Sequence, residues 1–389
     1  MRAQTLLTML TLAGTLCASR PPAPTPTTHA PATAQPAVSP SPREATAAST
    51  NPVAATSTPA AAGTAGPALT SAAPQIAGCQ VFPDDNIWNT PIDTLPAHPN
   101  SAAFVETIGL DANVHADFGS GEWDGGPIGI PYVVVPGDQA KVAVSFLWDD
   151  ESDAGPYPVP ADPPIEGGPD ADGDRHILLL DEDNCVLYEL FHAYPEDGGA
   201  WSADGGAIFD LGSNLLRPDT WTSGDAAGLP ILPGLVRYDE VASGEITHAL
   251  RFTAPETLDG YVWPARHEAS DLTGAEYPPL GLRFRLRADF DVSSYSAPVQ
   301  VILRALKKYG LILADNGSSW YISGVPDERW DDDMLHELDD VLGSDFVAVD
   351  SSSLMLNPDS GQVKPPIVFT DFLFLPLLNR LGAAGLAGN

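Results

Sequence analysis

The sequence predicts a mainly β fold, a β-sandwich or jelly-roll-like domain with two or three peripheral helices. Many short apolar runs are separated by turns rich in Gly, Pro, Asp and Asn, which is typical of strands joined by short connections. Few segments have the helical period, and strands do not alternate with helices as they do around a parallel sheet. We therefore expect one mainly β domain over residues 78–355.

The segments that flank this domain have different compositions. Residues 1–19 combine a basic start, a short apolar run and small residues, which predicts a secretory signal peptide rather than a membrane anchor. A lipoprotein start at Cys17 is a weaker alternative, because the residues before it lack the expected order. Residues 20–77 are mainly Pro, Ala, Thr and Ser and predict a disordered linker. Residues 356–389 form a tail whose apolar stretch is expected to be an edge strand or a sorting signal.

The strongest element is a hairpin over residues 174–194, where two apolar runs flank a short Asp/Asn cluster. Both runs are nearly continuous, which indicates a central position in a sheet that is covered on both faces. With an even number of loop residues, His176 lies opposite Phe191 and Leu178 lies opposite Glu189. His176 and Glu189 then become diagonal neighbours, while Arg175 and His192 are expected to meet on the other face.

The remaining elements follow from apolar periodicity in chain order. A short helix is expected at 101–108, an amphipathic helix at 298–308 and a helix at 331–342 that opens with three aspartates. Residues 149–173 form a polar loop of a length usually reserved for function or disorder. The strand candidates outside the hairpin are 129–135, 141–148, 206–212, 247–253, 282–290, 310–314, 320–324 and 346–350.

Two cysteines remain once the predicted signal peptide is removed. Cys79 opens the folded domain and Cys185 lies at the tip of the hairpin. An even pair in a secreted chain predicts a disulfide, the alternative being two buried thiols.

The formal net charge of −34 restricts the classes of partner. Such a surface repels phosphate backbones and anionic lipid headgroups, so nucleic acid and membrane insertion are not expected. A neutral extracellular polysaccharide is the expected partner of a secreted monomer held near the cell surface by its linker.

Carboxylates and tryptophans together favour chemistry on glycans. Glycosidic cleavage requires one carboxyl group as an acid and another as a base or nucleophile, and aromatic rings offer flat faces to sugars. The candidate catalytic residues are Glu189, Asp239, Glu240, Asp315 and His176. The candidate substrate-binding residues are Trp201, Trp221, Trp263, Trp320, Arg266 and His267.

Metal binding has weaker support in the sequence. No HExxH or paired-cysteine spacing is present, so a His-ligated, cupin-like centre would have to assemble from separate strands, with His176, His192, His248 and His267 as ligands. Asp170, Asp172 and Asp174 alternate around a glycine as calcium ligands do, although the glycine is misplaced for an EF-hand. We expect no required cofactor, with calcium as the candidate ion.

The sequence therefore predicts a secreted glycoside hydrolase on a neutral polysaccharide. The main alternative is a non-catalytic carbohydrate-binding or adhesion protein, in which tryptophans form a platform and the histidines are structural. A cupin-like metalloenzyme is the second alternative. Convergence of carboxylates in a cleft would favour the enzyme, whereas a flat aromatic face would favour the binding protein.

Overall fold

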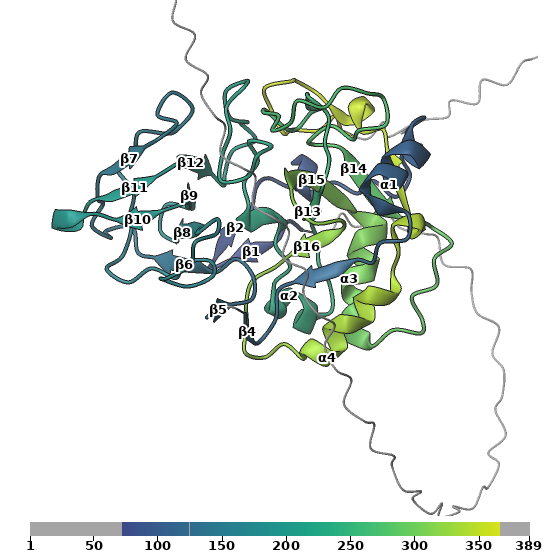
Figure 1. The fold of residues 1–389 in the computed structure, drawn as a ribbon, viewed down its shortest axis with the longest axis horizontal. Helices are drawn as coiled ribbons and strands as arrows, with labels where there is room; N and C mark the ends of the chain where they lie inside the picture. Colours follow the sequence, from purple (N-terminus) through teal and green to yellow (C-terminus); the bar gives the residue numbers. More distant parts are fainter. Residues whose placement is uncertain (1–71, 124, 366–389) are drawn as a thin grey trace, which may run out of the picture. The chain divides into compact units, whose positions relative to one another are not determined.

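The computed structural model describes residues 72–123 and 125–365 (Figure 1). Strands exceed helices in these residues, so the predicted mainly β class is confirmed. The finer arrangement, a sandwich or jelly roll, stays a prediction. The predicted signal peptide and most of the linker and tail lie outside the described residues. Strand β1 (Gln75–Ile76) pairs with β2 (Cys79–Gln80), so pairing begins at Gln75, inside the segment expected to be linker.

A four-stranded sheet contains the central hairpin in the order β12-β9-β8-β6. Its strands are β6 (Tyr132–Val135), β8 (Ile177–Asp181), β9 (Val186–Phe191) and β12 (Gly205–Asp210). Leu178 pairs with Glu189, which confirms the predicted register. Alternate residues of β8 enter two different hydrophobic clusters, so the sheet is covered on both faces, as its continuous apolar runs predicted.

A three-stranded sheet lies beside this one in the order β10-β11-β7. It consists of β7 (Val144–Phe146), β10 (Tyr194–Pro195) and β11 (Trp201–Ala203). Trp201 and Ala203 pack with residues of β8 and β9 in the smaller hydrophobic cluster. The chain leaves β7 through Trp148 directly into the long loop at 149–173.

A six-stranded mixed sheet forms the other half of the fold, in the order β17-β14-β15-β13-β16-β3. Its strands are β3 (His115–Asp117), β13 (Leu250–Ala254), β14 (Arg283–Leu286), β15 (Leu311–Asn316), β16 (Tyr321–Ser323) and β17 (Phe346–Val349). Strand β13 runs parallel to β15, and β16 runs parallel to β3. The sequence did not predict parallel strands, because no regular alternation of strands and helices was visible. Strands β13 and β15 can run parallel because β14 and a helix connect them along the chain.

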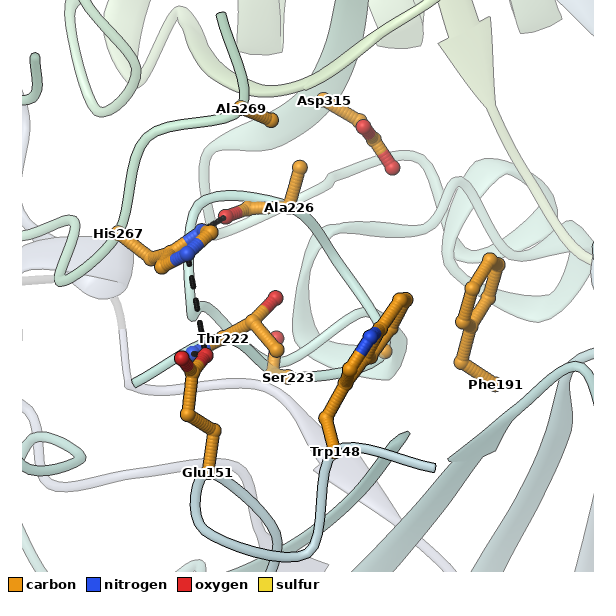
Figure 2. A pocket seen from close by; sticks show the side chains of 10 residues that line it. Trp148, Glu151, Phe191, Thr222, Ser223, Ala226, His267, Ala269 and Asp315 are labelled. Atoms are coloured by element: carbon orange, nitrogen blue, oxygen red, sulfur yellow. Dashed lines mark hydrogen bonds and ion pairs between the residues drawn. The ribbon is translucent and has the colours of Figure 1, made fainter. Parts of the chain in front are cut away.

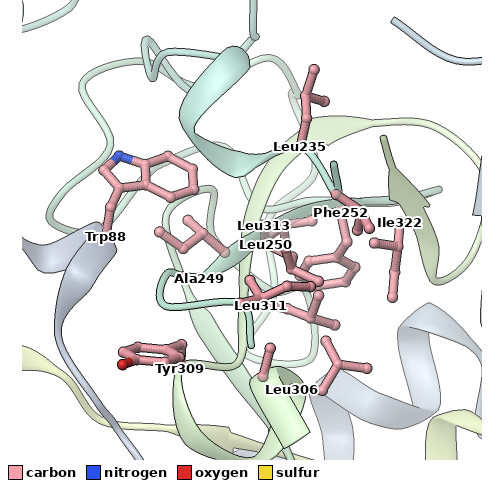
Figure 3. Close-up of a cluster of buried hydrophobic side chains, with 14 of the residues drawn as sticks. Trp88, Leu235, Ala249, Leu250, Phe252, Leu306, Tyr309, Leu311, Leu313 and Ile322 are labelled. Carbon is pink, nitrogen blue, oxygen red and sulfur yellow. The ribbon is translucent and has the colours of Figure 1, made fainter. Parts of the chain in front are cut away.

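That helix is α3 (Ala297–Lys308), which confirms the predicted amphipathic helix. Its apolar side, with Leu306, packs on residues of the six-stranded sheet such as Leu311 and Leu250 (Figure 3). Pro298 lies in the first turn, where its fixed φ is favourable. Lys307 and Lys308 lie in the last turn, where positive charge is favourable. The packing of this face, rather than helix propensity, provides most of its stability.

The other helices are short. They are α1 (Ser101–Gly109), α2 (Tyr238–Ser243) and α4 (Asp332–Leu335). The helix expected at 331–342 consists of α4, capped by the Asp331 side chain, followed by a 3₁₀ segment at His336–Asp340. Further 3₁₀ turns occupy Ile87–Asn89, Asp197–Gly199, Leu232–Gly234, Gly343–Asp345 and Ser352–Leu354.

Cys79 and Cys185 form the predicted disulfide, with a Cα–Cα distance of 5.4 Å across 106 residues of chain. The bond joins the start of the ordered chain to the tip of the central hairpin. A small hairpin of β4 (Glu122–Trp123) and β5 (Gly126–Pro127) stands apart from the larger sheets. In the described part of the chain, no helix has the length and apolarity needed to cross a membrane.

Candidate functional site

A pocket of about 340 Å³ lies where the four-stranded sheet, the long loop and the end of β15 meet (Figure 2). Two carboxylates, a histidine and two aromatic rings line it, together with small residues of one loop. Pockets of this volume are suited to small ligands or to one end of a larger one. The lining residues are Trp148, Glu151, Phe191, Thr222, Ser223, Gly224, Ala226, His267, Ala269 and Asp315.

Asp315 reaches the pocket because β15 is irregular at this point. Leu313 pairs with Phe252 and Asp315 pairs with Thr253, so Ala314 is an extra residue in a β-bulge. A bulge bends the strand and changes the direction of the side chain beside it. The Ala314 carbonyl accepts from the amide of Ala227 at 3.0 Å, which fixes the pocket loop against the bulge.

The environment of Asp315 favours its protonated form. Burial and the nearby Asp225 carboxylate raise the pKa of Asp315 to about 7, although Arg251 acts in the opposite direction. The side chain is 24 % exposed, so the carboxyl group still faces the pocket. A carboxyl group with this pKa can donate a proton near neutral pH, as a general acid must.

Beneath Asp315 lies a buried ion pair between Asp225 and Arg251. Arg251 Nε donates to Asp225 Oδ2 at 2.9 Å, and a second guanidinium nitrogen donates to the other carboxylate oxygen. Another guanidinium nitrogen donates to Ser323 Oγ, and Arg251 Nη2 lies 3.9 Å from Asp315 Oδ2. The charge of Arg251 is therefore largely balanced by Asp225, which explains why it does not hold Asp315 ionised.

Glu151 and His267 form another part of the pocket wall. Glu151 Oε2 accepts from the amide of Thr222 at 3.3 Å and lies 3.8 Å from His267 Nε2. His267 Nδ1 faces the Ala226 carbonyl at 3.0 Å, so it carries a proton and donates. In Figure 2 the Glu151 carboxylate and the Asp315 carboxylate lie on different sides of the pocket.

Trp148 and Phe191 provide the aromatic part of the pocket. Their rings are nearly parallel, with an interplanar angle of 11° and centroids 5.7 Å apart. Trp148 is 38 % exposed, so one region of the indole remains available to a ligand. A Cβ at Gly205 would lie only 3.3 Å from the Trp148 ring, so the absence of a side chain there leaves room for the indole.

His176 supports the pocket from below without lining it. Its Nε2 donates to the Gly224 carbonyl at 2.9 Å, and its Nδ1 lies 2.5 Å from Glu166 Oε2. Burial disfavours the imidazolium, but the Glu166 carboxylate outweighs burial and raises the pKa of His176 to about 9. His176 is therefore an imidazolium that donates on both sides and fixes the loop at Gly224.

Glu189 is also near the pocket but does not face it. It is fully buried, and its carboxylate oxygens accept from the amides of Ile231 and Leu232 at 2.9–3.0 Å. Burial raises the pKa of Glu189 to about 7, and the two amides oppose this shift. His176 and Glu189 lie on the same face of the hairpin, as the register predicted, but the carboxylate that pairs with His176 is Glu166.

Asp239 and Glu240, the other predicted catalytic carboxylates, belong to a different region. Glu240 forms ion pairs with Arg237 at 2.7 Å and with His248 at 3.1 Å. Asp239 is exposed and pairs with Arg329 at 2.8 Å. Neither residue lines the pocket, so neither can act together with Asp315 there.

The predicted aromatic platform is not assembled either. Trp320 is fully buried and Trp201 is 8 % exposed, so both rings belong to the core. Trp221 and Trp263 are half-buried, and Trp263 donates to the Ser360 carbonyl. Arg266 is buried and binds Asp359 at 2.9 Å, whereas its neighbour His267 does line the pocket.

Of the predicted metal ligands, Asp174 and His176 lie together with Glu166, within 4.8 Å of one another. Both ring nitrogens of His176 are engaged in hydrogen bonds, so the imidazole has no free lone pair for a metal. Asp170 and Asp172 are exposed, and the guanidinium of Arg175 occupies the carbonyls of Pro169 and Ala171 in the same loop. Calcium binding by this loop stays a prediction.

The cupin-like histidine set is not brought together in the described residues. His192 binds Asp204 at 2.9 Å and accepts from the Tyr194 hydroxyl, while Arg175 stacks on the Tyr194 ring instead of meeting His192. His248 pairs with Glu240, and His267 lies beside Glu151. Each of these histidines has its own side-chain partner.

Comparison of the chain with protein-family models, curated proteins and solved structures finds no match. The function is therefore inferred from the geometry of the pocket.

Proposed function

We propose that this protein is a secreted glycan-acting hydrolase whose active site is the pocket between Asp315 and Glu151. The observation that carries this proposal is the Asp315 carboxyl group, which has a pKa raised to about 7 and faces a pocket with a second carboxylate. Two carboxyl groups with different environments are the arrangement that glycoside hydrolysis requires. Asp315 was one of the four predicted catalytic carboxylates. Glu151 was not predicted, and it provides the second carboxylate in place of Glu189, Asp239 and Glu240.

In this reaction Asp315 donates its proton to the glycosidic oxygen as the bond to the anomeric carbon breaks. Glu151 accepts a proton from the attacking water, so that the water oxygen becomes the new anomeric hydroxyl. The released sugar hydroxyl carries the proton of Asp315, and a proton exchange with solvent restores both residues. Trp148 offers its indole face to the sugar ring, and His267 keeps Glu151 in place. As part of the same proposal, the protein acts outside the cell and requires no cofactor.

The test is a screen of the purified chain against soluble polysaccharides, measuring the release of reducing ends. We expect Asp315→Asn and Glu151→Gln to lower the rate by at least ~100-fold, a typical contribution of general acid–base catalysis. Asp111→Asn is a matched control, because Asp111 is exposed and does not line the pocket. Circular dichroism of each variant separates loss of chemistry from loss of fold. A full rate in both pocket variants would overturn the proposal.

A second candidate function is glycan binding without cleavage. The exposed indole of Trp148 favours it, since an aromatic face alone retains sugars. This function predicts retention on a glycan affinity gel with no products, and loss of retention in Trp148→Ala but not in Asp315→Asn.

A further inference from the structure

We propose that the pocket selects glycans whose sugars carry free amino groups, so that the polymer is cationic. This inference rests on the proposed glycan-binding function of the pocket and adds the class of substrate. It departs from the neutral polysaccharide that the overall composition suggested. Three features of the pocket carry it.

The first feature is the sign of the charge. The described pocket wall contains the Glu151 carboxylate, with His267 Nε2 at 3.8 Å, and neither Lys nor Arg, whereas Asp315, with its pKa raised to about 7, is mainly protonated at pH 6. Two guanidinium groups contact residues of the wall, and each is balanced by a carboxylate outside it: Arg251 pairs with Asp225, and Arg217 pairs with Asp153 at 2.5 Å. A sugar that carries a carboxylate or sulfate would find no Lys or Arg in this described wall, whereas an ammonium group would be attracted to Glu151.

The second feature is unused hydrogen-bond acceptors. Within the described ranges, Glu151 Oε1 has no donor, and Oε2 has one amide donor at 3.3 Å. An ammonium group offers three N–H donors and a positive charge to such acceptors.

The third feature is the aromatic wall. The indole of Trp148 and the ring of Phe191 present π surface in the same pocket as the carboxylates. An ammonium group within about 6 Å of an aromatic face is attracted to it, most strongly by Trp. A sugar ring stacked on Trp148 would therefore gain from an amino substituent as well as from its apolar face. The net charge of −34 would also draw a cationic polymer toward the protein.

The experiment is calorimetric titration of the full chain with three oligosaccharides of equal length and linkage. The first is a fully deacetylated glucosamine oligomer, the second its N-acetylated form and the third the corresponding glucose oligomer. At pH 6, where the amine is protonated, we expect the glucosamine oligomer to bind at least about tenfold more tightly than either neutral oligomer. Equal or tighter binding of a neutral oligomer would overturn the inference.

Two variants locate the effect. Glu151→Gln should remove most of the preference for the amino sugar, whereas Asp111→Asn, which changes the net charge equally, should keep it. If both variants keep the preference, the attraction is a property of the whole acidic surface and the inference fails. The Trp148 indole N–H resonance, assigned with Trp148→Phe, should shift with the glucosamine oligomer, and this readout does not depend on the folding of Glu151→Gln.

Hydrolysis is measured separately, so the two proposals can fail independently. Preferential binding of the glucosamine oligomer without products would contradict the hydrolase and support the present inference. Cleavage of a neutral polysaccharide with no amino-sugar preference would support the hydrolase and contradict the present inference.

Discussion

The Nε2 atom of His176 donates to the carbonyl oxygen of Gly224 at 2.9 Å, which ties the central hairpin to the loop that forms one wall of the pocket. On the other side of the ring, Glu166 holds the imidazole at 2.5 Å. A Cβ at Gly224 would lie within 3.7 Å of both His176 and Glu189, so the loop approaches the hairpin closely at this glycine. The shape of the pocket therefore depends on an ion pair that does not itself line the pocket.

The first prediction concerns the pH dependence of stability from this ion pair. The pKa of His176 rises from 6.5 to about 9 on folding, because the attraction of Glu166 outweighs the cost of burial. The stabilisation is therefore complete below pH 6.5 and is lost as the pH rises through about 9. Its size is about 3 kcal/mol in the free energy of unfolding. Urea denaturation at pH 6 and pH 9.5 measures the total loss, to which Glu189 also contributes, and the comparison with Glu166→Gln isolates the part due to His176.

Glu166→Gln should remove most of that pH dependence and lower the stability at pH 6. Glu106→Gln, at an exposed position on α1, is the control with the same change of charge. If Glu166→Gln retains the loss of stability between pH 6.5 and 9, His176 is not the group responsible.

The second prediction concerns Glu189. Because burial raises the pKa of Glu189 from 4.5 to about 7, the folded state binds this proton more tightly than the unfolded state. Stability from this group is present below pH 4.5 and is lost as the pH rises through about 7, by roughly 3 kcal/mol. Glu189→Gln keeps an acceptor for the amides of Ile231 and Leu232 and should flatten the stability profile in this range. An unchanged slope in thermal unfolding would contradict the prediction.

The local elements could be predicted from the sequence because neighbouring residues determine them. The register of the hairpin follows from its turn, and helix α3 follows from its apolar spacing. The disulfide could be predicted from the pair of cysteines that remains outside the predicted signal peptide. The parallel pairing of β13 with β15 could not be predicted in this way, since it depends on a connection through β14 and α3.

The pocket was only partly predictable, because its residues come from distant segments. Asp315 could be singled out because it directly follows the predicted strand 310–314, and His267 was one of the predicted substrate-binding residues. Glu151 could not be distinguished among 52 acidic residues, although the length of its loop was a signal of function. Glu189, in contrast, was easy to notice as an acid within an apolar run. Only the structure shows that its carboxylate accepts from two backbone amides and does not face the pocket.

The third prediction concerns the disulfide. A cross-link that closes a loop of 106 residues removes conformations from the unfolded chain. Replacing both cysteines with serine should lower the free energy of unfolding by ~5 kcal/mol in the chain-entropy model. Differential scanning calorimetry of the oxidised chain, the reduced chain and the double variant checks this value. Equal melting temperatures in all three would contradict it, as would alkylation of both thiols in the unreduced native protein.

The fourth prediction concerns Asp225, which controls the acid form of Asp315 from below the pocket. Apart from burial, Asp225 raises the pKa of Asp315, while Arg251 and His176 lower it. Asp225→Asn would leave the charge of Arg251 unbalanced at 3.9 Å from Asp315 Oδ2. The pKa of Asp315 should then fall by at least about one unit, and its proton would be lost at a lower pH.

NMR titration of the Asp315 carboxyl carbon measures this pKa directly, independently of any substrate. In the hydrolase assay, the alkaline limb of the pH–rate profile should move to lower pH by the same amount, because that limb reports loss of the acid. Asp359→Asn is the matched control: it breaks the ion pair of Arg266 with Asp359 but leaves Arg251 and Asp225 in place. Asp225→Asn is also expected to lower stability, since it leaves a buried guanidinium without its carboxylate. The titration is therefore made at a temperature at which circular dichroism shows the variant to be folded. A pKa of Asp315 that stays the same or rises in Asp225→Asn would show that burial alone keeps this group protonated.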